Sequence, residues 1–165
     1  MAELRNDSGA LRFAVDLVAR EASAEILPAA ETSHPGHGSI LASAGLEYLD
    51  RRDGEWWPLV RIPVLHIPAH AAERLASQVA DFLRGGVTGF AWRPGDDAAA
   101  GLQVGAAPGG AVVEVGLDLG AFLAESAGVP RRLDAELALF RFRATQGDLV
   151  RFSDALVREL EALRR

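Results

Sequence analysis

The chain has 165 residues, 49% hydrophobic and 24% charged, values that exclude disorder, collagen-like repeats and a coiled coil as descriptions of the whole. Its length fits a single domain over residues 1–165, in which we expect residues 1–9 to form a flexible N-terminus. The net charge of −6 argues against nucleic acid and anionic membranes as partners, and the lack of cysteine excludes disulfides, thiolate metal sites and cysteine nucleophiles.

The first third of the chain predicts a strand and a loop. Apolar side chains occupy every second position from Leu11 to Ala19, so we expect a half-buried strand over residues 11–20. Residues 29–39 combine proline and glycine with serine, threonine and histidine, and therefore predict a surface loop.

A hairpin is expected next. Asp53-Gly54 readily adopts the positive φ angles of a tight turn, and it separates residues 44–51 from residues 55–67. The second arm and the residue after it contain prolines, which cannot donate to a strand ladder. This arm should therefore lie at a sheet edge or be interrupted by bulges. The prolines are Pro58, Pro63 and Pro68.

The rest of the chain predicts a helix, a meander and a second helix. An apolar stripe over about residues 69–84 ends at Gly85-Gly86, a typical helix stop. Thr145, with Asp148 three residues later, predicts the N-cap of the final helix. Proline and glycine turns separate the intervening strands, and a change of apolar phase in the last strand suggests a bulge or burial on both faces. The expected strands cover residues 87–92, 101–106, 111–119 and 133–143, and the final helix covers residues 147–163.

These elements predict an α+β fold with a mostly antiparallel sheet of about six or seven strands and two helices packed on one face. Antiparallel meanders leave a sheet face or an edge exposed, so a homodimer that covers it is one hypothesis. No apolar run approaches the ~20 residues that span a bilayer, and the N-terminus has no signal-peptide pattern. We therefore expect a cytoplasmic protein with no membrane partner.

Four histidines form two pairs, and imidazole is a common metal ligand. His34 and His37 lie in the predicted loop, while Pro68 lies between His66 and His70, so a continuous metal-binding helix is not assured. A small enzyme or metal protein built on these histidines remains an alternative, against surface and helix-start histidines as the simpler interpretation. We assign no metal, cofactor or catalytic residue.

The tryptophans and a group of arginines are the candidates for partner binding. Trp56 and Trp57 should point to opposite faces of their strand, so that one is core and the other exposed or covered. Trp92 precedes a turn, where a tryptophan can anchor a partner. Arg131, Arg132, Arg141 and Arg143 could form a basic strip for an anionic ligand or acidic surface, which keeps a small-ligand-binding module as another alternative.

The carboxylates give no catalytic pattern. Asp50, Asp53 and Glu55, like Asp96 and Asp97, fall in predicted turns, where local hydrogen bonding explains them. The chain has no lysine, so no phosphate-binding G-x-x-x-x-G-K-[ST] loop is present.

The order of elements resembles that of small bacterial proteins that neutralise contact-delivered or polymorphic toxins, and of related uncharacterised domains. The similarity covers about residues 55–165: the proline-started helix from His66 to Leu83, the Phe90–Pro94 segment, the meander, and the helix from Gly147 to Leu163. It implies noncatalytic binding, and no active-site residue is carried over. We therefore predict a noncatalytic protein-binding domain with an unknown protein partner, and the resemblance implies that this partner is a toxin that the domain neutralises.

Overall fold

The computed structural model describes residues 1–20, 38–94, 100–118 and 137–164. These residues confirm the α+β class and the antiparallel pairing, with eight strands and two helices. The expectation of one sheet with six or seven strands is wrong, because the strands form two four-stranded sheets. Sheet A has the order β1-β2-β3-β4 and sheet B the order β5-β6-β7-β8. The elements are β1 (Ala2–Arg5), β2 (Leu11–Arg20), β3 (Ser39–Leu49), β4 (Trp56–Pro68), α1 (Ala69–Leu83), β5 (Gly89–Trp92), β6 (Ala100–Ala107), β7 (Gly110–Asp118), β8 (Leu137–Thr145) and α3 (Gln146–Ala162).

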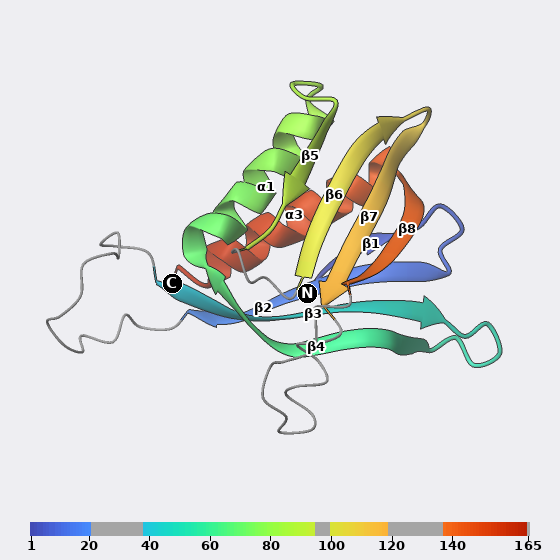
Figure 1. Cartoon of the computed structure of the whole chain (residues 1–165), viewed down its shortest axis with the longest axis horizontal. Coiled ribbons are helices and arrows are strands. Elements are labelled where there is room, and N and C mark those ends of the chain that lie inside the picture. The colour runs from blue at the N-terminus through green and yellow to red at the C-terminus, as the bar shows by residue number, and fades with distance from the viewer. Residues whose placement is uncertain (21–37, 95–99, 119–136, 165) are drawn as a thin grey trace, which may run out of the picture.

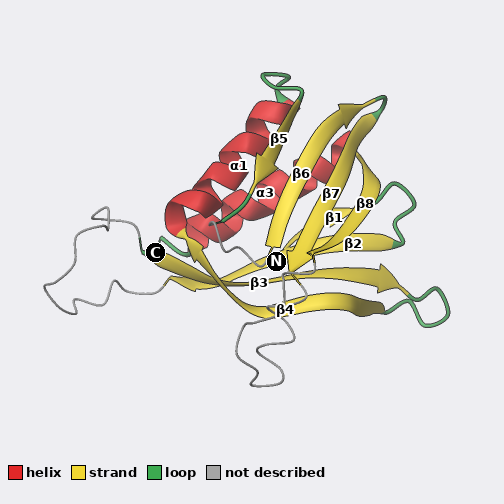
Figure 2. Cartoon of the chain, viewed as in Figure 1, coloured by secondary structure: helices red, strands yellow, loops and turns green. Residues whose placement is uncertain are grey.

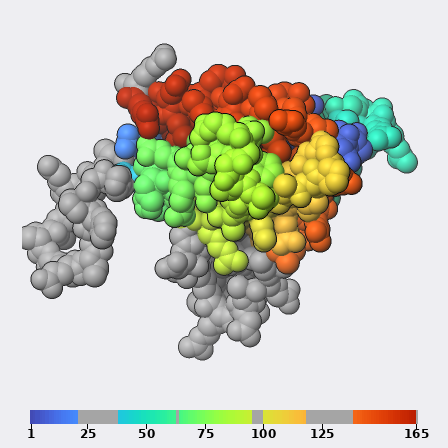
Figure 3. All heavy atoms as spheres, turned by 90° about the horizontal axis from the view of Figure 1, so that it is seen from above, coloured from blue at the N-terminus to red at the C-terminus, as the bar shows by residue number. Residues whose placement is uncertain are grey.

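The two sheets are stacked with their strands in different directions. In Figures 1 and 2, sheet A runs across the view and sheet B rises above it, with α3 passing behind sheet B and α1 lying beside β5. The two helices lie side by side, as the view from above in Figure 3 also shows. One hydrophobic cluster joins side chains from both sheets and both helices. The helix α1 follows β4 directly, so the next strands begin a second sheet instead of extending the first.

Residues 1–9, which we expected to be flexible, contain the edge strand β1. Ala2 and Leu4 are completely buried, and β1 packs between β2 and α3. Four residues are too few to show a clear period, and the alternating Glu3 and Arg5 give the segment a polar composition. Burial of only two apolar side chains therefore orders this segment.

The β3–β4 hairpin has the predicted turn. Gly54 adopts a φ of 77°, and Asp50 N–H donates to the Glu55 carbonyl at 2.9 Å. The prediction for the second arm is also confirmed, because β4 is an edge strand with two register shifts against β3. Its three prolines therefore interrupt a strand that has only one neighbour in its sheet.

The ends of the helices follow from local sequence. Gly85 adopts a φ of 76° after α1, and the backbone N–H of Gly86 donates to the Asp81 carbonyl in a Schellman arrangement. Thr145 is the N-cap of α3, and Asp148 completes the predicted capping box. The N-terminus of α1, by contrast, has no side-chain cap.

Sheet B has a regular ladder. The Pro108-Gly109 turn joins β6 to β7, as predicted, with Gly109 at a φ of 78°. The pairing of β7 with β8 shows no register shift, so the bulge suggested for the last strand is absent from the described part of β8. Its phase change leaves Leu139 on the outer face, 59% exposed. The predicted 29–39 loop lies mostly outside the described residues.

Candidate functional site

The end of the β3–β4 hairpin carries a group of exposed apolar side chains, which we call the hairpin patch: Tyr48, Trp57 and Leu59. Their exposed fractions are 39%, 49% and 48%. Tyr48 pairs with Trp57 across the ladder, so both side chains point to the same face of sheet A. This is the face of the buried Leu46, two residues before Tyr48, but the end of the hairpin projects from the rest of the molecule (Figures 1 and 3).

Trp56 lies on the opposite face of the hairpin, as strand alternation predicted. The Arg12 Cζ atom lies 4.3 Å from the Trp56 ring centroid and the Arg5 Cζ atom 5.4 Å from it. Arg12 also donates to Glu47 at 2.6 Å and to Glu3 at 2.8 Å. Cation–π contacts and ion pairs therefore hold Trp56 in a half-buried position and tie all four strands of sheet A together.

Trp92, the third candidate tryptophan, is a core residue. Its side chain is 2% exposed, and its indole N–H donates to the Ala71 carbonyl at 2.7 Å. The hydrogen bond joins β5 to the first turn of α1. Because a partner cannot reach Trp92, it does not belong to the candidate surface.

Two of the four arginines predicted to form a basic strip lie on the same face of β8. Arg141 and Arg143 are exposed on the outer face of sheet B, opposite Glu114 and Val112 of β7. The Arg143 guanidinium donates to the Pro108 carbonyl at 2.8 Å, and its own carbonyl accepts from the backbone of Asp7. Arg131 and Arg132 lie outside the described residues.

The histidines are spread over different elements where they can be placed. His66 lies on β4 and His70 in the first turn of α1, and both are exposed. His34 and His37 lie outside the described residues. Within the described ranges, no group of three or more His, Cys, Asp or Glu side chains is placed to hold a metal ion.

The turn carboxylates have local roles. The Asp50 carboxylate accepts from the Arg52 backbone and the Asp53 carboxylate from the Glu55 backbone, both at 2.9 Å. These bonds shape the hairpin turn. Asp96 and Asp97 lie outside the described residues.

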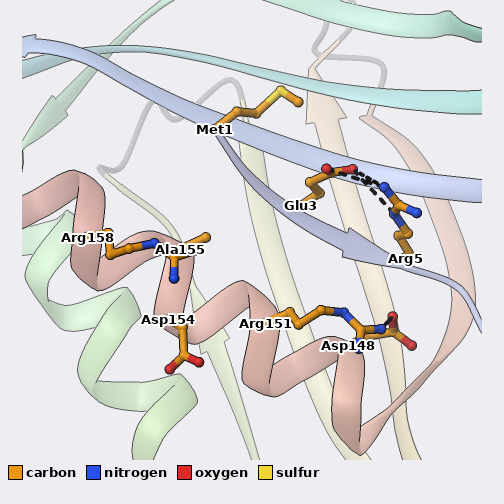
Figure 4. A pocket seen from close by; sticks show the side chains of 8 residues that line it. All are labelled: Met1, Glu3, Arg5, Asp148, Arg151, Asp154, Ala155 and Arg158. Atoms are coloured by element: carbon orange, nitrogen blue, oxygen red, sulfur yellow. Dashed lines mark hydrogen bonds and ion pairs between the residues drawn. The ribbon is translucent and has the colours of Figure 1, made fainter.

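A charged pocket of about 400 Å³ lies between β1 and α3 (Figure 4). Glu3 pairs with Arg5 and Arg12, while Asp148 is buried and accepts from Arg151 and Thr145. Asp154 points away from β1 in this view. The carboxylates of Glu3 and Asp148 are therefore paired with arginines and, for Asp148, with the cap of α3.

The N-terminal amine contacts the same helix. Burial alone would lower the pKa of the Met1 ammonium, but hydrogen bonds and charge attraction from Glu159 and Asp16 raise the pKa above 8.0. Glu159 also accepts from the Leu17 backbone at 2.9 Å. This carboxylate therefore fastens α3 to two strands of sheet A.

Comparison with known proteins adds little. No protein-family model and no curated protein matches the chain. A solved structure, described as that of the plant transcriptional regulator PBF-2, is 11% identical, with a TM-score of 0.46 over 94% of this chain and 78% of that one. This similarity is too low to support an argument about function. In the described ranges, no helix has both the length and the apolar character needed to cross a membrane.

Sequence analysis missed Tyr48 and Leu59. Counting back from the Asp53-Gly54 turn places Tyr48 opposite Trp57, and this register could have suggested the pair. The exposure of Leu59 depends on the register shift beside it, which the sequence does not reveal.

Proposed function

We propose that this chain is a noncatalytic protein-binding domain and that the hairpin patch is its contact surface. The observation that carries the proposal is the 49% exposure of Trp57 beside exposed Tyr48 on a projecting hairpin. Tryptophan and tyrosine are enriched among the residues that dominate binding energy at protein interfaces. An exposed pair of this kind gives a partner a large apolar area at little cost in side-chain entropy.

The surroundings of the patch also suit an interface. Arg12 holds Trp56 on the other face, and internal hydrogen bonds order the turn. The hairpin therefore loses little conformational entropy when a partner binds. The turn also supplies a charged rim of both signs around the apolar centre, as is common at protein interfaces. The exposed rim residues are Arg51, Arg52, Asp53 and Glu55.

The first experiment is purification of the untagged chain from its native host, with mass spectrometry of what accompanies it. A stoichiometric partner is then purified and its affinity for variants is measured by biolayer interferometry. We expect Trp57→Ala to weaken binding by about 2 kcal/mol, roughly 30-fold in Kd. The matched control is Val150→Ala, which truncates an exposed side chain on α3 and should change Kd less than twofold.

Two results would overturn the proposal. One is the absence of any stoichiometric protein partner, and the other is a partner whose Kd is unchanged by both Trp57→Ala and Leu59→Ala. A second copy of the chain is one form the partner can take. Light scattering at twice 17.5 kDa for the native chain, and at 17.5 kDa for Trp57→Ala, would identify it.

Toxin neutralisation is the role that the element-order resemblance favours for such a domain. If the partner is a toxin, its expression alone should stop growth of the host and co-expression with this chain should restore it. The Trp57→Ala chain should restore growth less well. Equal rescue by the native chain and by Trp57→Ala would show that neutralisation does not depend on the hairpin patch.

A further inference from the structure

A groove of about 680 Å³ lies between α1 and β5, at the opposite end of β4 from the hairpin patch. The helix contributes His70, Arg74 and Gln78, which recur at intervals of one helical turn along one face. Ala91, Arg93 and Pro94 line the other side. The volume lies within the range of small-molecule sites, about 300–1,000 Å³, and exceeds what a lone inorganic anion fills.

The groove has two cationic side chains that find no acidic partner in the part of the chain that the structure describes. The Arg74 guanidinium donates to the Arg93 carbonyl at 2.8 Å, which places the two residues side by side. Within the described ranges neither guanidinium forms an ion pair, and no described lining residue is acidic. The acids of α1 are used elsewhere, since Glu73 pairs with Arg164 and Asp81 with Arg84.

Gln78 adds an unused acceptor. Its Nε2 atom lies 3.5 Å from the Ala91 carbonyl, while its Oε1 atom is buried and has no hydrogen-bond partner among the described residues. Four helical residues separate Gln78 from Arg74, a rise of about 6 Å. A buried acceptor without a donor is costly, so a ligand that supplies an O–H or N–H here would be favoured.

The end of α1 adds to the positive potential. No side chain caps this N-terminus, and its first turn contains no acid. The positive end of the helix dipole is therefore not compensated where His70 and Pro68 border the groove.

We propose that the α1–β5 groove binds a small phosphorylated molecule. Arg74 and Arg93 hold the phosphate, because two guanidinium groups match a doubly charged anion with several acceptor oxygens. Gln78 accepts a hydrogen bond from a hydroxyl or amino group of the same ligand, about one helical turn from the phosphate. This site is separate from the hairpin patch, so each can fail without the other.

The test is isothermal titration calorimetry of the full chain in chloride buffer with ribose 5-phosphate, AMP, inorganic phosphate and ribose. We expect at least one of the two esters to bind one-to-one and at least tenfold more tightly than inorganic phosphate, and ribose to give no saturable signal. No saturable binding by either ester would overturn the proposal. Binding of a short dT oligomer without binding of the esters would overturn it in favour of a nucleic-acid backbone.

Two variants and a matched control assign the roles. Arg93→Gln should weaken ester binding about tenfold or more, because a charged hydrogen bond is lost. Arg84→Gln removes an equal charge just beyond the end of α1, outside the groove, and should change affinity less than twofold. Equal losses of affinity in the two variants would show that only the net charge of the protein matters, and would overturn the proposed site.

Gln78→Met should weaken binding of the ester and leave binding of inorganic phosphate unchanged. An equal effect on both would overturn the role of Gln78. Circular dichroism spectra and melting temperatures should match those of the native chain. Arg93 is the safer test of the phosphate position, because its exposed guanidinium takes part in no hydrogen bond or ion pair among the described residues, whereas the Arg74 guanidinium also donates to a backbone carbonyl.

Discussion

The junction of α1 with β5 and the end of the β3–β4 hairpin use tryptophan in different ways. At the junction, Trp92 is 2% exposed and its N–H is bonded to a helix carbonyl. At the hairpin, Trp57 is 49% exposed, while Trp56 is held by arginines on the opposite face. Cover from a helix makes the first tryptophan structural, whereas about half of the Trp57 side chain stays exposed at the projecting end of the hairpin.

Replacement of Trp92 should have the largest effect on stability. Trp92→Ala removes a buried aromatic side chain and its hydrogen bond, so we expect a loss of about 4 kcal/mol in the free energy of unfolding. Urea denaturation followed by circular dichroism would measure it. Trp92→Phe should cost less, because most of the apolar volume is retained. A loss below about 1 kcal/mol for Trp92→Ala would contradict a core role.

Replacement of Arg12 should have an intermediate effect on stability. Arg12→Gln removes a largely buried guanidinium from two carboxylates and from the Trp56 ring, and we expect a loss of about 2 kcal/mol. The matched control is Arg5→Gln, on the same face but more exposed, which should cost less than about 1 kcal/mol. If urea denaturation gives equal losses of unfolding free energy for both variants, Arg12 does not stabilise sheet A more than Arg5 does.

The Met1–Glu159 pair should add a smaller, pH-dependent term in a chain that begins at Met1. The folded-state pKa of the ammonium is raised above 8.0, so its contribution is present below pH 8.0 and is lost as pH rises through the folded pKa. The stability difference between the native chain and Glu159→Gln should therefore shrink above pH 8.0. Glu161→Gln, a control elsewhere on α3, should show no such trend, and a difference that grows with pH would contradict the pair.

Trp57→Ala should change the free energy of unfolding least, by less than about 0.5 kcal/mol. The side chain is half-exposed and forms no hydrogen bond among the described residues. This variant tests the comparison most directly. A loss close to that of Trp92→Ala would show that the hairpin tryptophan is structural. The measurement is the same urea denaturation, with Tyr48→Ala as the companion variant.

Much of the fold could be predicted because local signals determine it. The Asp53-Gly54 turn, the prolines of β4 and the Thr145 cap each depend on neighbouring residues, and each lies where expected. The division into two sheets could not be predicted, since a period of two does not say which strands pair. That division depends on α1, which separates β4 from β5.

The candidate site could be predicted only in part. Strand alternation predicts opposite faces for Trp56 and Trp57, but which one is covered depends on Arg5 and Arg12 from other strands. The pairing of Arg74 with Arg93 depends on how a helix meets a strand 19 residues later, which no motif reveals. Trp92 next to a turn suggested a surface position, and the first turn of α1 covers it.

The prolines of β4 have a consequence for the behaviour of this chain at high concentration. An exposed edge strand next to apolar side chains is a common starting point for the growth of intermolecular β-structure and fibrils. A proline has no amide hydrogen to offer an incoming strand, so Pro58, Pro63 and Pro68 interrupt such a template along β4. The hairpin can therefore display an exposed tryptophan with less risk that the chain aggregates.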